Sequence, residues 1–160
     1  MSDVLAELHK LGGVSSRRPT TALNAARLIR TAGRYRWVGL YDVLPTEIAV
    51  IAWDGPEAPT YPTFPLAQGL NGAAVATKRA VIVQDVSKDP RYLTTIGGTR
   101  GEFIQPVIDH FGKVVGTIDV ESDVTNAFGP NDESLLSACA EALLWLWTPS
   151  DNSLERHASQ

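Results

Sequence analysis

Three acidic residues stand out because of their places in two strand-like segments. The stretch "GEFIQPVIDHFGKVVGTIDVESD", residues 101–123, has two runs of apolar and β-branched residues around a turn near Gly112, a pattern that predicts a β-hairpin. Residues two apart in a strand face the same side, so Asp119 and Glu121 share a face. Pairing across the hairpin brings Glu102 to the same end. The sequence therefore predicts a cluster of three carboxylates.

Carboxylates held this close repel one another, which limits what the cluster can do. Full ionisation is disfavoured unless a cation lies among the groups, and otherwise one carboxyl group stays protonated and donates a hydrogen bond. Either arrangement suits a small ligand that carries an ammonium group or a strong acceptor oxygen. The alternative interpretation is a solvated end of a hairpin that binds nothing.

The composition is typical of one globular domain and excludes several kinds of partner. The chain has 160 residues, a formal net charge of -4 and no basic run longer than Arg17 and Arg18, so we expect no nucleic-acid surface. No apolar stretch approaches the roughly 20 residues of a membrane helix. The N-terminus lacks the basic start and apolar middle of a signal peptide. We therefore expect a cytoplasmic protein with neither nucleic acid nor membrane as partner.

Cysteine and histidine are too sparse to form the usual metal or redox sites. Cys139 is the single cysteine, and His9, His110 and His157 lie far apart in the sequence. One thiol excludes an intramolecular disulfide and any paired-cysteine zinc site. On this basis we expect no metal site and no cofactor.

The elements that must position these residues alternate between helices and strands. We expect helices over residues 3–11, 20–31, 71–79 and 129–147, and strands over 35–43, 47–53, 80–86 and the two arms of the hairpin. This order predicts an α+β fold with an antiparallel sheet and helices packed over it. We divide the chain into an N-terminal helix and linker (1–18), a folded domain (19–148) and a flexible tail (149–160).

Several motifs carry a resemblance to a known family. The runs "FPLAQGLNGAAVATKRAVIVQDVSKDPRYL", "PVIDHFGKVVGTIDV" and "FGPNDESLL" follow one another in the order and spacing of the GAF domain pattern, which the chain resembles from about Thr20 to Trp147. The resemblance implies a GAF fold: a six-stranded antiparallel sheet with helices on one side and a ligand pocket on the other. Within that superfamily, "WVGLY", "GLNG", "QDV", "GEF" and "GTIDVES" are most similar to the free methionine-(R)-sulfoxide reductases.

The resemblance also implies which residues line the pocket. Trp37, Tyr41, Glu102, Asp119 and Glu121 fall where the reductases line their substrate site. Glu121 stands where that family usually has the shorter aspartate. Trp37 and Tyr41 share a strand face with a glycine between them, and we expect the gap between the two rings to admit a ligand. The alternative is that both rings are ordinary core.

Two positions depart from the reductases in a way that affects the chemistry. Asn71 stands where the reductases have a cysteine, and Thr95 stands where they have the nucleophilic cysteine. Sulfoxide reduction in such enzymes begins with thiolate attack on sulfur and ends with a disulfide, which a threonine hydroxyl cannot reproduce. We therefore expect no catalytic residue, and we expect Asn71 and Thr95 to contribute to ligand binding.

The last helix is apolar around more than one face. "LLSACAEALLWLW" places Trp145 and Leu146 beside the main apolar stripe, and such a helix must bury more than one side. We expect a homodimer through the first and last helices. The alternative is that the N-terminal helix covers the tryptophans Trp145 and Trp147 within one chain.

These observations lead to one functional prediction and two alternatives. The prediction is a non-catalytic GAF domain, sensory or regulatory, that binds a small polar metabolite such as methionine sulfoxide or another amino acid derivative. The first alternative is a free methionine-(R)-sulfoxide reductase that works by a non-standard route. The second is a dimerisation module with a vestigial pocket.

Overall fold

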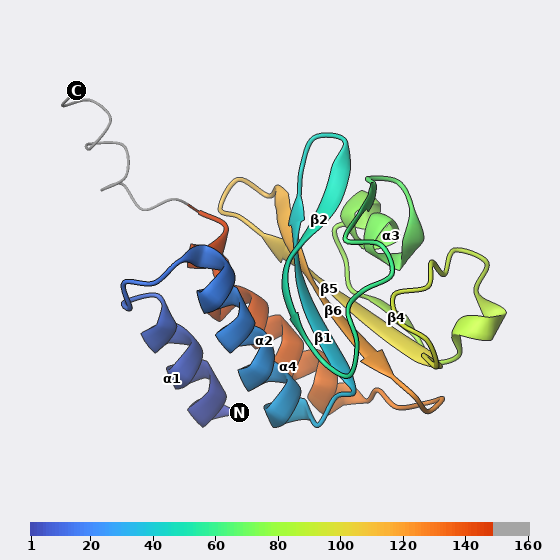
Figure 1. Ribbon diagram of the computed structural model, residues 1–160, viewed down its shortest axis with the longest axis horizontal. Helices are drawn as coiled ribbons and strands as arrows, with labels where there is room; N and C mark the ends of the chain where they lie inside the picture. Colours follow the sequence, from blue (N-terminus) through green and yellow to red (C-terminus); the bar gives the residue numbers. More distant parts are fainter. Residues whose placement is uncertain (149–160) are drawn as a thin grey trace.

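One antiparallel sheet of six strands organises the molecule, with strand order β3-β2-β1-β6-β5-β4 (Figure 1). The structure is a computed structural model that describes residues 1–148, and the predicted tail 149–160 lies outside the described residues. The α+β class and the six-stranded antiparallel sheet are confirmed. The strands are β1 (Trp37–Val43), β2 (Glu47–Asp54), β3 (Thr63–Pro65), β4 (Val81–Val83), β5 (Gly101–Ile108) and β6 (Val114–Ser122).

The helices divide unequally between the two faces of the sheet. Two helices lie against one face, α2 (Arg18–Gly33) and α4 (Pro130–Ala142), and α1 (Ser2–Leu11) packs on these two helices from outside (Figure 1). On the other face lie α3 (Gly69–Thr77) and the long loops, including a 3-10 turn at Val86–Lys88, whereas a second 3-10 turn at Leu144–Leu146 follows α4 on the helical side. No helix within residues 1–148 is both long enough and apolar enough to cross a membrane.

The alternation of β6 explains why the two faces differ. Ile118 and Val120 belong to the apolar core that packs under α2 and α4. Asp119 and Glu121 alternate with them and therefore face α3. Because β6 pairs with β1 on one side and with β5 on the other, its side chains lie at the centre of the sheet.

The predicted strand and helix boundaries differ from the structure in several places, including β4, which spans Val81–Val83 and not residues 80–86. The residue pattern missed β3, which has three residues and lies at an edge of the sheet. The helix predicted from residue 20 begins at Arg18, with a proline in its first turn, where a missing N–H is tolerated. The guanidinium of Arg18 pairs with the carboxylate of Asp42 at 2.7 and 2.8 Å, which anchors this helix start to β1.

The last helix was predicted to run to Trp147, but α4 ends at Ala142. The chain then turns, and the indole N–H of Trp147 donates a hydrogen bond of 3.0 Å to the backbone oxygen of Tyr41. The indole lies directly over Gly116, where an added Cβ would come within 2.1 Å of it. The helical path is therefore interrupted by a contact with β1 that sequence periodicity does not encode.

The first helix is part of the core. Val4 and Leu8 of α1 are buried in the cluster formed with α2 and α4. Trp145 packs against Gly12, just after α1, where a Cβ would lie 3.0 Å from the indole. Residues 1–13 thus cover part of the apolar surface from which the homodimer was predicted, as in the alternative interpretation for Trp145. The homodimer itself stays a prediction.

Candidate functional site

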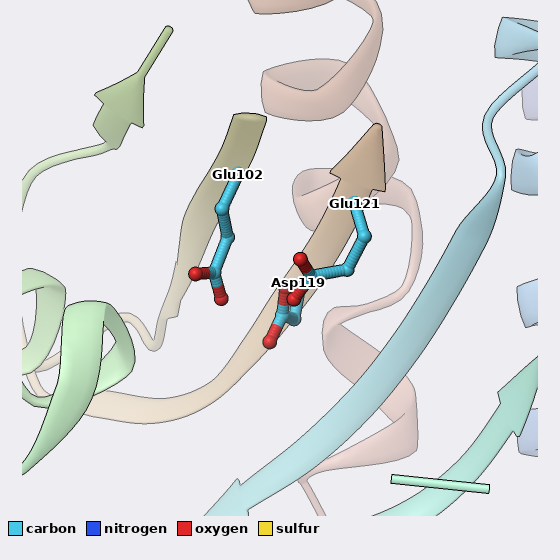
Figure 2. A group of neighbouring side chains, drawn as sticks. All are labelled: Glu102, Asp119 and Glu121. Carbon is cyan, nitrogen blue, oxygen red and sulfur yellow. The ribbon is translucent and has the colours of Figure 1, made fainter. Parts of the chain in front are cut away.

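The three predicted carboxylates converge between the sheet and α3. Glu102 projects from β5, and Asp119 and Glu121 project from β6, with their carboxyl groups pointing toward one another (Figure 2). One oxygen from each lies within 4.8 Å of the others. The side chains are 1%, 0% and 0% exposed, respectively, so the alternative of a solvated hairpin end does not hold.

Hydrogen bonding leaves most of these oxygens without a partner. The amide nitrogen of Asn71 donates to Asp119 Oδ2 at 3.0 Å, and Asn71 Oδ1 accepts a 2.6 Å hydrogen bond from Thr117. Glu102 Oε2, Asp119 Oδ1 and both Glu121 oxygens have no partner among residues 1–148. Nor do the three acids belong to any ion pair in that part of the chain. The site is therefore a buried concentration of acceptors with no counter-charge.

This environment favours protonated carboxyl groups. Burial raises the pKa of Glu102 well above its usual range, and repulsion from Asp119 and Glu121 adds to the increase. Burial likewise raises the pKa of Asp119, and repulsion from Glu121 adds to it, while the hydrogen bond from Asn71 opposes the increase. The pKa of Glu121 is also raised by burial, against a lowering contribution from Thr95. At a given pH the cluster therefore holds more protons than three exposed carboxyl groups would.

Trp37 and Tyr41 share one face of β1, as predicted, and this is the face toward α3, but the gap expected between their rings is closed. A Cβ at Gly39 would come within 2.3 Å of the Trp37 ring and 3.0 Å of the Tyr41 ring, so both rings fold over the glycine. Trp37 also stacks on Trp53 at a centroid distance of 6.4 Å, and its N–H donates to the backbone oxygen of Glu57. Gly39 therefore makes room for side chains of the protein itself, and Trp37 is a core residue in this conformation.

A small cavity adjoins the acids on the α3 side. Its volume is about 10 Å³, which is room for about one water molecule. Its lining includes Tyr41, Phe64, Asn71, Leu93, Thr95 and Glu102. The structure thus brings together six of the seven predicted ligand residues here or in the acid cluster beside it, and Trp37 packs against Tyr41 behind them.

The loop that carries Thr95 closes the cavity. It is tied to its surroundings by three hydrogen bonds: Thr60 N–H to the Thr95 oxygen, Gly97 N–H to the Glu57 carboxylate, and the Arg36 guanidinium to the Gly97 oxygen. Two of these bonds are solvent-exposed. A ligand larger than a water molecule therefore requires this loop to move.

Two neighbours of the acids were missed by sequence reasoning. Burial raises the pKa of Tyr92, and the charges of Glu121 and Glu102 add to the increase, so its phenol lies near the cluster. The Thr99 hydroxyl is buried and has no hydrogen-bond partner among the described residues. Its proximity lowers the pKa of Glu121, against the larger effect of burial. The only sequence signal for either residue was the unusual length of the polar loop between β4 and β5.

The single cysteine is remote from this site. Cys139 lies on α4, on the opposite face of the sheet, and is fully buried in the apolar core. Burial raises the pKa of its thiol to about 12. A thiol of this kind is not a nucleophile at neutral pH.

Comparisons with known proteins agree with this arrangement. The GAF domain profile matches residues 20–143. Protein YtsP from Bacillus subtilis is 27% identical over 120 residues, which cover 74% of this chain and 72% of that protein. Free methionine-R-sulfoxide reductase from Saccharomyces cerevisiae is 33% identical over 76 residues, 48% of this chain and 42% of that protein.

A solved structure supports the same assignment. The type II free methionine-R-sulfoxide reductase from Thermoplasma acidophilum superposes with a TM-score of 0.74 at 27% identity, over 81% of this chain and 92% of that one. The predicted similarity to these reductases is confirmed, and with Cys139 as its single cysteine the chain lacks their catalytic thiols. This chain belongs to the GAF domain family.

Proposed function

We propose that this GAF domain is a non-catalytic sensor of a small polar metabolite, for example methionine sulfoxide or a related amino acid derivative. The observation that carries the proposal is the group of three buried carboxyl groups without a counter-charge. Buried carboxyl groups without partners oppose folding, and a bound ligand that pairs with them offsets this cost. Relatives that act on free methionine-R-sulfoxide make a ligand of that class the first to test.

The triad offers two ways to hold such a molecule. A protonated carboxyl group donates a hydrogen bond to a sulfoxide oxygen, and an ionised one accepts hydrogen bonds from an ammonium group. The aromatic cluster around Tyr41 and Phe64 supplies an apolar wall beside the polar end. Binding requires the Thr95 loop to open, because the closed cavity holds about one water molecule.

The absence of catalysis follows from the residues that surround the site. Thr95 and Asn71 offer a hydroxyl and an amide where the reductases use thiols, and neither forms a disulfide. The only thiol, in Cys139, is buried on the other face of the sheet. No turnover of methionine-(R)-sulfoxide is therefore expected with thioredoxin or small thiols. Turnover that disappears in Thr95→Ala or Cys139→Ser would contradict this.

A direct binding test uses the full chain in the presence of a metal chelator. Thermal unfolding is followed while free methionine-(R)-sulfoxide, its S epimer and methionine are added. A ligand at 100 times its Kd adds about 2.7 kcal/mol to the free energy of unfolding. We expect stabilisation by the R sulfoxide that weakens in Asp119→Asn and persists in Asp123→Asn. Asp123 is a matched control because it undergoes the same change at an exposed position.

The closed cavity favours a second function, a dimerisation module with a vestigial pocket. In that case no metabolite stabilises the protein, and sedimentation at micromolar concentration gives about twice the chain mass of 17.3 kDa. The dimer would use the outer surface of α1 and the part of α4 that residues 1–13 do not cover. A monomer at this concentration would contradict this function.

A further inference from the structure

One acid of the cluster, Glu121, has no partner among residues 1–148 for either of its carboxylate oxygens. Acidic residues often gather at protein surfaces without binding anything, so proximity alone indicates no ligand. Glu121, however, is 0% exposed, and neither of its carboxylate oxygens has a hydrogen-bond partner among residues 1–148. Both oxygens belong to a side chain directed into the cluster (Figure 2). Buried polar atoms in native proteins almost always have partners.

The spacing of the oxygens identifies the size of a suitable partner. One oxygen from each acid lies within 4.8 Å of the other two. Calcium binds oxygen at about 2.3–2.6 Å, so two ligands on opposite sides of the ion are about 4.6–5.2 Å apart. Magnesium binds at about 2.0–2.1 Å and needs near-octahedral geometry, so its ligands lie at most about 4.2 Å apart. The spread of this oxygen set fits the larger ion.

The ligand types agree with this size. All three charged ligands are carboxylates, which hard divalent cations prefer, and there is no imidazole or thiolate to select zinc or copper. Thr95 and Thr99 lie beside Glu121 and offer neutral hydroxyl oxygens. The adjoining cavity has room for one water molecule as a further ligand. Calcium accepts such irregular oxygen sets with six to eight ligands.

We propose that Glu102, Asp119 and Glu121 form a binding site for one hard divalent cation of the size of calcium. The cation supplies the counter-charge that no residue among 1–148 supplies, and it satisfies the partnerless oxygens. The prediction of no metal site rested on cysteine and histidine and did not consider a site made of oxygens alone. This site does not depend on the proposed metabolite, although a cation and an ammonium group would compete for the same oxygens.

The test uses the full chain, freed of metal with a chelator and then transferred to chelator-free buffer. Calcium chloride is titrated by calorimetry and thermal unfolding without any metabolite, with magnesium chloride in a parallel titration. We expect one calcium ion per chain, an increase in melting temperature, and binding of magnesium that is weaker by about tenfold or more. No binding of calcium up to about 10 mM, beyond the weakest calcium modules, would overturn the proposal.

Paired variants locate the site. Asp119→Asn should lower the calcium affinity by about tenfold or more, whereas Asp123→Asn should leave it unchanged. Should Asp119→Asn not fold, Glu121→Gln replaces it, with the exposed Glu141→Gln as its control. Calcium binding of equal strength in the triad variant and its control would place the ion elsewhere and overturn the assignment. Metabolite binding is measured with chelator present, so the proposed function and the cation site can fail separately.

Discussion

The two faces of the sheet use neighbouring residues for opposite purposes. Ile118 and Asp119 are adjacent in β6 and both fully buried, yet Ile118 packs into the core under the helices and Asp119 faces two other acids. Apolar burial on the helical side stabilises the fold by about 25 cal/mol per Å². Burial of carboxyl groups on the α3 side opposes folding. The helical face therefore supplies the stability that allows the opposite face to keep a destabilising site.

The largest effect is expected on the helical face. Leu136 of α4 is fully buried in the apolar core, so Leu136→Ala should lower the free energy of unfolding by about 2–5 kcal/mol. Urea unfolding followed by circular dichroism measures this. A loss no greater than that of an exposed alanine substitution such as Glu141→Ala would mean that the helices contribute little.

A smaller loss is expected where α4 gives way to the contact over β1. In Gly116→Ala the new methyl group would lie 2.1 Å from the Trp147 indole and 2.7 Å from the backbone oxygen of Tyr41. Forcing a methyl group into such a contact costs about 1–3 kcal/mol. The same substitution at Gly13, whose Cβ would be 3.6 Å from its nearest neighbour, is the control. Equal stabilities of the two variants would show that Trp147 is not held there.

The two faces of the sheet also differ in how much of their structure the sequence predicts. The period-two alternation of β6 predicted both the apolar side and the acid cluster, because strand geometry alone determines which side chains share a face. The missing side chain of Gly39 predicted a gap, which was wrong, since the orientations of the Trp37 and Tyr41 rings depend on Trp53 and other neighbours. The end of α4 was wrong for a similar reason, because it depends on a hydrogen bond to a residue 106 positions away.

The three buried acids should make the stability of the protein depend on pH. Because the folded state raises the pKa of Glu102, Asp119 and Glu121, it binds more protons than the unfolded state does above their unfolded pKa values of about 3.9–4.3. The contribution of these groups to stability is therefore complete below pH 4 and is lost as pH rises toward the folded pKa values. Each unit of upward shift corresponds to about 1.4 kcal/mol.

This pH effect can be isolated by difference. Urea unfolding in chelator between pH 5 and 8 should show a fall in stability that is steeper in the natural protein than in Asp119→Asn. Asp123→Asn should follow the natural protein, because it changes an exposed carboxylate. Identical pH slopes for all three proteins would mean that Asp119 titrates normally.

The smallest effect is expected from neutralising one acid of the cluster. At neutral pH, in chelator and without ligand, Asp119→Asn removes a charge from the repelling group while it preserves the side-chain shape. In the natural protein Asn71 donates a hydrogen bond of 3.0 Å to Asp119. The amide oxygen of the new asparagine can accept the same hydrogen bond. We therefore expect stability within about 0.5 kcal/mol of the natural protein or slightly above it, in contrast to the large loss in Leu136→Ala.

A fall of several kcal/mol would mean that the acids hold this face together by hydrogen bonds of their own, since loss of one partner in a buried polar network leaves the others unsatisfied. The α3 face would then stabilise the fold as the helical face does, and neither a metabolite nor a cation would be needed to explain its carboxyl groups.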